Sequence, residues 1–271
     1  MKRIAIGIGI ILIVMSILLI ALNFVGFLDS NIYSIYSDDD TYLDGSIKTI
    51  EKDFEPRSDL IKLKIEDSIG KIDIEGYNGD VVKIRAEKHV SFGSPDEIKV
   101  NMEYEGDTIL ISTKTPRHLI YPAKAKVYYN IKIPNDLVIE IDTESDVCSI
   151  DISNLNARNI DLEMDVGAIA IYDINASEII AETDVGSINV HLKKCCDMDL
   201  KTDTGSITVK IPKDSDVKID AESDVGSIYC DLPLGRETRG IVEHRIVGVI
   251  GSGRYRIDLK TDAGSIKIKG I

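Results

Sequence analysis

The sequence contains no tryptophan, only four histidines and only four cysteines in 271 residues. It has no C-x-x-C pair, and its histidines are scattered along the chain, so the usual ligand spacing of a zinc site is absent. A G-x-S-x-G motif, a glycine-rich phosphate loop and a Ser/His arrangement are absent as well. These absences exclude the common signatures of hydrolases and nucleotide-dependent enzymes, and we expect a protein without catalytic activity.

Positive charge is scarce beyond the first 28 residues. That part of the chain holds 30 Lys and Arg against 46 Asp and Glu, a net charge of −16. Such a surface repels the phosphates of nucleic acids and the headgroups of anionic lipids. We therefore expect no nucleic-acid partner, whereas cations and basic partners are compatible with the composition.

Charge of either sign is missing from Ile4 to Leu28. A helix of this length spans about 37 Å, more than the roughly 30 Å hydrocarbon core of a membrane. A cleaved signal peptide is the alternative, but its apolar region is usually much shorter, and no A-x-A-like site follows Leu28. The pattern predicts an uncleaved signal-anchor helix over residues 1–28. Lys2 and Arg3 place its N-terminus in the cytoplasm, so the remaining chain is expected outside the plasma membrane.

One short motif recurs through the second half of the chain, in the forms SDVCSI, MDVGAI, TDVGSI, TDTGSI, SDVGSI and TDAGSI. The residues at its centre are Cys148, Gly167, Gly186, Gly205, Gly226 and Gly264. They are separated by 19, 19, 19, 21 and 38 residues, and the last interval is twice 19. A fixed period near 20 residues is typical of a solenoid, in which each repeat is one unit stacked on the next.

Apolar and polar residues alternate on both sides of this motif. Isoleucine lies two residues after every central residue, and a second apolar residue follows two positions later. Another apolar residue stands seven positions before the centre. A period of two predicts strands with one inward face, so each repeat is expected to be strand, corner, strand. The predicted fold is all-β: a single-stranded parallel β-helix (β-solenoid) of about 19 residues per coil, preceded by one N-terminal transmembrane helix.

The predicted domain boundaries follow from these patterns. A polar stalk is expected over residues 29–50 and the β-solenoid ectodomain over residues 51–271. Within the ectodomain, wider irregular coils are expected over residues 51–133. Regular coils of 19 residues are expected over residues 134–271, with an insertion at 233–256.

The two ends of the predicted solenoid have their own signals. The segment 60–76 is a first, looser copy of the coil, with Gly70 at its corner. The final repeat runs to Ile271, so the last strand is expected at an open end. Lys267 and Lys269 on that strand would discourage edge-to-edge pairing.

These motifs together resemble the "putative adhesin" family, a domain of unknown function in bacterial and archaeal envelope proteins. The resemblance covers roughly residues 45–271. It rests on the DVGSI corners, on YNIKIP before the first regular coil and on VIGSGRYRIDLKTDAGSI near the end. It implies a β-helix in the cell envelope, in some members beside envelope-stress systems. The family has no known catalytic residues, so none is implied here; Cys148 replaces a corner glycine and Ala168 a corner serine.

An aspartate precedes each motif centre by two residues. These aspartates are Asp146, Asp165, Asp184, Asp203, Asp224 and Asp262. In a parallel solenoid they stack about 4.8 Å apart, where two carboxylates repel by about 0.9 kcal/mol in water. In one interpretation each carboxylate forms an Asx-turn that fixes the corner. In the other, cations such as Ca²⁺ bind along the ladder, although the denser motif of known calcium solenoids is absent.

A corner is due near residue 245, and the segment 233–256 takes its place. It contains five of the ten arginines of the chain and only two acidic residues. The candidate binding residues are Arg236, Arg239, Arg245, Arg254 and Arg256. A basic insertion on an acidic rod predicts a contact site for an anionic glycan, a phosphate group or a protein partner. In the alternative, it folds back and neutralises neighbouring carboxylates.

The cysteines do not indicate a disulfide framework. Cys230 occupies a core column, and Cys148 lies at a corner four coils away, far beyond disulfide reach. Cys195 and Cys196 are adjacent in a turn. Free thiols outside a membrane indicate a reducing or anaerobic habitat.

The patterns together predict a non-catalytic, membrane-anchored β-solenoid that serves binding, adhesion or scaffolding at the envelope. The expected partners are the membrane and an envelope glycan or membrane protein. The alternative is an accessory of envelope-stress sensing, in which any message passes through a membrane partner because only three residues precede the helix. A polysaccharide-active enzyme is the remote alternative, supported only by fold analogy.

Overall fold

The computed structural model describes residues 45–120, 125–234, 236–239 and 244–271. Gly45–Ile271 forms one compact unit with its own hydrophobic core. The predicted transmembrane helix over residues 1–28 lies outside the described residues, as does most of the predicted stalk. In the described part of the chain, no helix is both long and apolar enough to cross a membrane.

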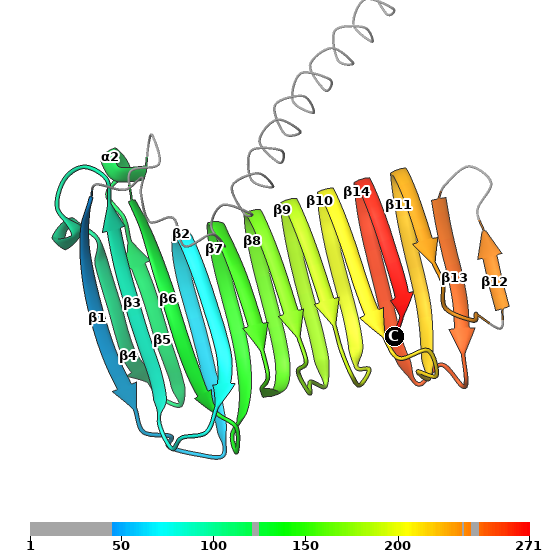
Figure 1. Ribbon diagram of the computed structural model, residues 1–271, viewed down its shortest axis with the longest axis horizontal. Helices are drawn as coiled ribbons and strands as arrows, with labels where there is room; N and C mark the ends of the chain where they lie inside the picture. Colours follow the sequence, from blue (N-terminus) through cyan, green and yellow to red (C-terminus); the bar gives the residue numbers. More distant parts are fainter. Residues whose placement is uncertain (1–44, 121–124, 235, 240–243) are drawn as a thin grey trace, which may run out of the picture. The chain divides into compact units, whose positions relative to one another are not determined.

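Long strands that each make one coil form the regular part of this unit (Figure 1). They are β2 (Leu60–Tyr77), β7 (Val138–Ser153), β8 (Asn156–Tyr172), β9 (Glu178–His191), β10 (Asp197–Ile211), β11 (Val217–Cys230) and β14 (Tyr255–Gly270). Each strand continues through the corner and pairs in parallel with the adjacent coils. The registers place Gly70, Cys148, Gly167, Gly186 and Gly205 side by side in successive coils. The predicted all-β solenoid and the corner at Gly70 are thereby confirmed.

The core consists of columns of equivalent side chains from successive coils. Along each strand, buried and exposed residues alternate, as the period of two predicts. The isoleucines Ile150, Ile169, Ile188 and Ile207, two residues after the motif centre, are all 0% exposed. Burying such a side chain contributes about 1.5–3 kcal/mol, so the repeated columns are a major source of stability.

The corner glycines bring the backbones of neighbouring coils into contact. Gly167, Gly205 and Gly226 have φ between +151° and +157°, a backbone region that residues other than glycine rarely adopt. A Cβ added at Gly205 would lie 1.7 Å from the carbonyl oxygen of Gly186. Cys148, at the equivalent corner of β7, does not have a positive φ, which explains why a side chain is tolerated there.

Over residues 51–133, where wider coils were predicted, β2 forms a coil but the other strands do not. The elements are β1 (Ser46–Phe54), β3 (Val82–Val90), the 3₁₀ helix η1 (Pro95–Glu97), β4 (Lys99–Glu105), β5 (Thr108–Lys114), α2 (Arg117–Ile120) and β6 (Ala125–Pro134). β3 pairs antiparallel with β1 and β6, and β4 pairs antiparallel with β5. β5 and β6 then pair in parallel with the two halves of β2. Since side chains alternate with period two in parallel and antiparallel strands alike, the sequence pattern does not distinguish the two pairings. β1 also begins inside the predicted stalk.

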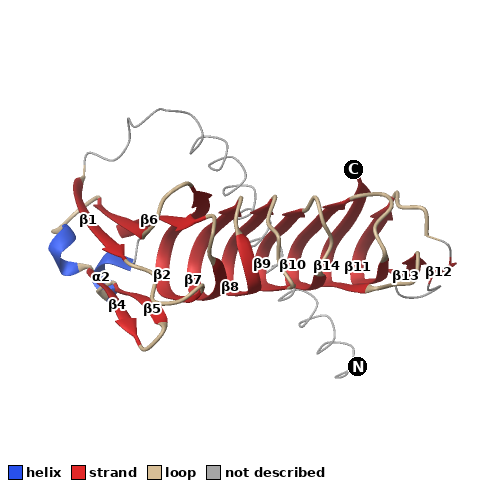
Figure 2. Ribbon diagram, turned by 90° about the horizontal axis from the view of Figure 1, so that it is seen from below, coloured by secondary structure: helices blue, strands red, loops and turns tan. Residues whose placement is uncertain are grey.

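The last strand of the chain is not the last strand of the solenoid. β14 lies between β10 and β11 and pairs in parallel with both (Figures 1 and 2). The predicted insertion forms β12 (Arg236–Arg239) and β13 (His244–Ile250), which pair antiparallel and extend the sheet beyond β11. Lys267 and Lys269 therefore lie on an internal strand, and the prediction that they protect an open edge is wrong.

Candidate functional site

The outward side chains give the coils two chemically different faces. Before the corner, β7, β8 and β9 present an acidic face. Its exposed residues include Asp142, Glu144, Asp161, Glu163, Glu178 and Glu182. After the corner, β8, β9 and β10 present a neutral face of small side chains, which ends at the last outward residues of the three strands, Tyr172, His191 and Lys210. Its half-buried residues are Ala168, Ala170, Ser187, Asn189, Ser206 and Thr208. Both faces repeat the same kinds of side chain from coil to coil.

The corner aspartates form a ladder along the junction of the two faces. In spatial order they are Asp146, Asp165, Asp184, Asp203, Asp262 and Asp224, and all are exposed. β14 inserts Asp262 between Asp203 and Asp224, a neighbour relation that the sequence spacing did not predict. Among the described residues, these carboxylates accept no hydrogen bond, so the predicted Asx-turns are not formed. The corner is held instead by continuous strand pairing, with a positive φ at Gly167, Gly205 and Gly226.

The ladder places like charges in a row without gathering them around one point. Partial burial raises the pKa of Asp146, and the neighbouring carboxylates of Asp165 and Glu144 raise it further. Each regular coil from β7 onwards contributes one aspartate to the ladder. Across the residues that the structure describes, no group of three or more His, Cys, Asp or Glu side chains is arranged to hold a metal ion. The arrangement is therefore a row of like charges along the junction of the two faces.

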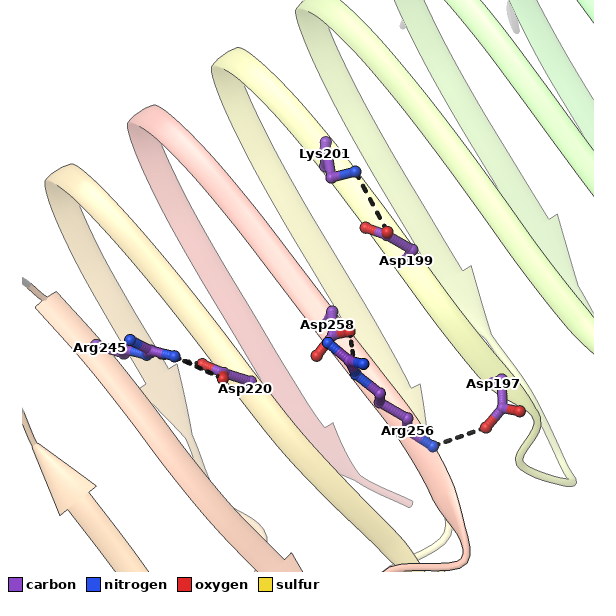
Figure 3. A network of polar contacts seen from close by, with 7 residues as sticks. All are labelled: Asp197, Asp199, Lys201, Asp220, Arg245, Arg256 and Asp258. Atoms are coloured by element: carbon purple, nitrogen blue, oxygen red, sulfur yellow. Dashed lines mark hydrogen bonds and ion pairs between the residues drawn. The ribbon is translucent and has the colours of Figure 1, made fainter.

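The arginines predicted as binding residues are distributed over β12, β13, β14 and the residue before β14, Arg254. Arg245 in β13 makes two hydrogen bonds with Asp220 of β11, of 2.9 Å and 2.7 Å, and lies 3.7 Å from Glu222 (Figure 3). The hydrogen bond with Arg245 is the main reason why the pKa of Asp220 is lowered. Arg236 and Arg239 belong to β12, which pairs with the outer side of β13. Arg245 thus neutralises carboxylates at the end of the acidic face.

Arg256 and Arg254 also have partners close to them in the chain or the sheet. Arg256 forms an ion pair with Asp258, and its backbone N–H donates to Asp197 Oδ1 at 2.7 Å (Figure 3). The guanidinium of Arg254 lies 5.2 Å from the centroid of the Tyr255 ring. The structure does not gather these side chains with Arg245 at one point, because β11 lies between β13 and β14. Arg245 and Arg256 thus pair with carboxylates, as in the interpretation in which the insertion folds back, whereas the described contact of Arg254 is with the Tyr255 ring.

Three aspartates that the sequence analysis did not select fix the position of β14. Asp216 accepts hydrogen bonds from the backbone N–H groups of Gly253 at 2.6 Å and Arg254 at 3.2 Å, and from the Ser252 hydroxyl at 2.8 Å. The Ser252 bond is the largest cause of the lowered pKa of Asp216. The other two are Asp197, bonded to Arg256, and Asp231, which accepts from the Gly270 N–H at 2.6 Å. An aspartate beside the end of a strand was the available signal, since such side chains often bind nearby backbone groups.

The four cysteines are free thiols in the structure. Cys148 is buried at its corner, and Cys195 Sγ lies 3.0 Å from Ser215 Oγ, to which it donates. Burial raises the pKa of Cys196 to about 12. Since the thiolate is the reactive form, Cys196 is not a nucleophile at neutral pH.

Comparisons with known proteins agree with the fold. The Toastrack DUF4097 family matches residues 56–269. A "putative cell adhesion protein" from Clostridium sporogenes has a TM-score of 0.53 at 17% identity, covering 83% of this chain and 100% of that chain. A "putative adhesin" from Bacteroides fragilis has a TM-score of 0.32 at 16% identity, covering 82% and 97%. No curated protein sequence matches this chain significantly. Because the family match spans most of the chain and agrees with the motifs that resemble the "putative adhesin" family, this chain belongs to the Toastrack DUF4097 family.

Proposed function

We propose that this protein is a non-catalytic element of the cell surface that binds, adheres or acts as a scaffold, and that residues 1–28 anchor it in the plasma membrane. The observation that supports the proposal is the pair of long, regular faces on the solenoid. Each repeats one kind of side chain at the strand spacing of about 4.8 Å, which suits an extended or repetitive partner. A structure that shares this fold, from Clostridium sporogenes, is also described in terms of cell adhesion.

The neutral face is the better candidate for the contact. Up to Lys210 at the end of β10, its outward positions on β8, β9 and β10 have no charge, in a chain that is 29% charged and has a net charge of −14. A partner can cover this face without removing carboxylates from water, which costs several kcal/mol per buried ion. The acidic face repels anionic surfaces and keeps the protein in solution. We therefore assign adhesion to the neutral face.

Sedimentation with envelopes isolated from the organism itself tests this function. The compact unit, residues 45–271, is mixed with envelopes with and without EDTA, and the pelleted fraction is measured. Asn189→Glu adds a charge to the neutral face, and Ile180→Glu adds the same charge to the acidic face of the same strand. We expect Asn189→Glu to lose pelleting and Ile180→Glu to keep it, with both variants folded by circular dichroism.

Two other outcomes have a definite meaning. Pelleting that EDTA abolishes and Ca²⁺ restores would assign the binding to carboxylates rather than to the neutral face. The absence of pelleting by the unchanged unit would contradict the adhesive role and would favour a membrane protein as partner.

A further inference from the structure

At the C-terminal end of the solenoid, one half of β11 has no neighbouring strand on its outer side among the residues that the structure describes. β14 pairs with β11 from Val217 to Cys230 on one side. On the other side, β13 pairs only from Val217 to Ser223. Within the described ranges, no strand pairs with the outer side of Val225–Tyr229. We call this segment the β11 edge.

The β11 edge exposes apolar side chains and opens the core. Val225 is 71% exposed and Tyr229 is 55% exposed. Ile228 is partly exposed and packs at the boundary of the core. Its equivalents in the other regular coils, Ile150, Ile169, Ile188, Ile207 and Ile266, are all 0% exposed. A strand added at this edge would complete the same column.

The β11 edge also lacks the charges that protect the other free edges of the sheet. In β1, Lys48 and Lys52 pair with the buried residues Lys88 and Ile84 of β3, so both lysines point to the inner side. Inward-pointing charges of this kind prevent the addition of another strand. β4 has the charged sequence KVNMEYE and β12 the sequence RETR. The β11 edge has the sequence VGSIY, with no charged residue.

We propose that the β11 edge is a docking site for an extended segment of a partner protein, which adds to the sheet as a β-strand. Main-chain hydrogen bonds supply the affinity in this mode, and alternate side chains supply the specificity. The edge lies between two exposed carboxylates, Asp224 and Asp231. The partner segment is therefore a short run of uncharged, β-branched or aromatic residues with a lysine or arginine on each side. The inference deepens the proposed binding role, on which it rests, by naming one class of partner.

A second copy of this chain is a poorer occupant. The other free edge of the same half of the sheet is β1, whose inward lysines oppose addition. Two β11 edges paired antiparallel would bring Asp224 and Asp231 of one copy towards the same carboxylates of the other, and like charges would repel. A basic partner segment has the opposite effect.

Binding of the labelled heptapeptide KVTVYVK to the full chain in detergent micelles tests the proposal, with fluorescence anisotropy as the readout. Val225→Lys places a positive charge on the edge. The matched control is Val147→Lys, the equivalent position of β7, which is paired on both sides. We expect Val225→Lys to weaken binding at least tenfold and Val147→Lys to leave it within twofold. The peptide EVTVYVE, with acidic ends, should bind at least tenfold more weakly to the unchanged chain.

Hydrogen exchange identifies the mode of binding. Saturating KVTVYVK should slow exchange of the amides in Val225–Tyr229 and leave those of β7 unchanged. Absence of binding, protection elsewhere, or equal effects of both lysine variants would overturn the proposal. Dimerisation in sedimentation velocity that Val225→Lys abolishes would assign the edge to a second copy instead. Because no envelopes are present, a failure here is distinguishable from a failure of envelope adhesion.

Discussion

Replacement of Gly205 by alanine tests whether contact between backbones at the corners holds the coils together. Gly205 has φ +154°, and an added Cβ would lie 1.7 Å from the carbonyl oxygen and 2.8 Å from the carbonyl carbon of Gly186. Cβ contacts below 3.0 Å essentially do not occur. Since the obstacle is backbone on a paired strand, β9 and β10 would have to separate by on the order of 1 Å at the corner, a distance that breaks hydrogen bonds.

The cost has two parts. Holding alanine at this φ costs about 1–3 kcal/mol, and each ladder hydrogen bond weakened on either side of β10 costs about 1 kcal/mol. We expect Gly205→Ala to lower the free energy of unfolding by about 3–5 kcal/mol. Gly106→Ala is the matched control. Gly106 has φ +64° with no atom within 4 Å of the added Cβ, so only backbone strain of about 1–2 kcal/mol applies.

Urea unfolding followed by circular dichroism measures both variants. The predicted order is wild type, then Gly106→Ala, then Gly205→Ala, with at least about 1.5 kcal/mol between the two variants. This gap reflects the hydrogen bonds and the contact that only the corner variant loses. Equal losses would refute the reasoning, because they would mean that the coils move apart at no cost and that the corner glycines serve only backbone conformation.

Three smaller perturbations test the side chains. Arg245→Met removes the partner that lowers the pKa of Asp220; it should cost about 0.5–1 kcal/mol at pH 7. A carboxyl with a lowered pKa stabilises the fold above its unfolded pKa of about 3.9, so this cost should vanish on acidification through the folded pKa, as measured by urea unfolding. Asp165→Asn should lower the pKa of Asp146 in a ¹³C NMR titration, and an unchanged pKa would contradict coupling along the ladder. Thr202→Val removes a buried hydroxyl without a hydrogen-bond partner and should raise the melting temperature, corresponding to about 1 kcal/mol; a decrease would show that the hydroxyl is satisfied.

The regular coils could be predicted because each position of the repeat requires the same kind of residue in every coil. Gly167, Gly186 and Gly205 lie where backbones touch, and isoleucine fills the core two residues later, so the requirement repeats with the coil length. The period therefore gives the strands, the corners and the inward residues. Over residues 51–133 the same alternation exists without a fixed period, and alternation does not determine strand direction.

The partners of the arginines and the contacts of the ladder could not be predicted from the sequence to the same extent. Gly226 and Gly264 are separated in sequence by two repeat lengths. This spacing predicted an insertion at 233–256 in place of one corner. In the structure the chain adds β12 and β13 outside β11 and then returns. Asp220 became the partner of Arg245 only because β13 pairs with β11. A contact of this kind depends on strand order, and a repeat period contains no information about strand order.

Repetition itself leaves the order of strands open, because any coil presents matching columns to any other. The corner glycine of β14 contacts that of β10, and the corner glycine of β11 contacts that of β14 in the same way, so neither contact selects a neighbour. The selection comes from the ends of β14, where backbone N–H groups need partners. Asp197 at the start of β10 and Asp216 just before β11 bind the backbone at the start of β14, and Asp231 beyond β11 binds its end. Carboxylates beside both neighbouring strands thus accept hydrogen bonds from the backbone at the two ends of β14. Residues outside the repeat therefore determine where the last repeat lies.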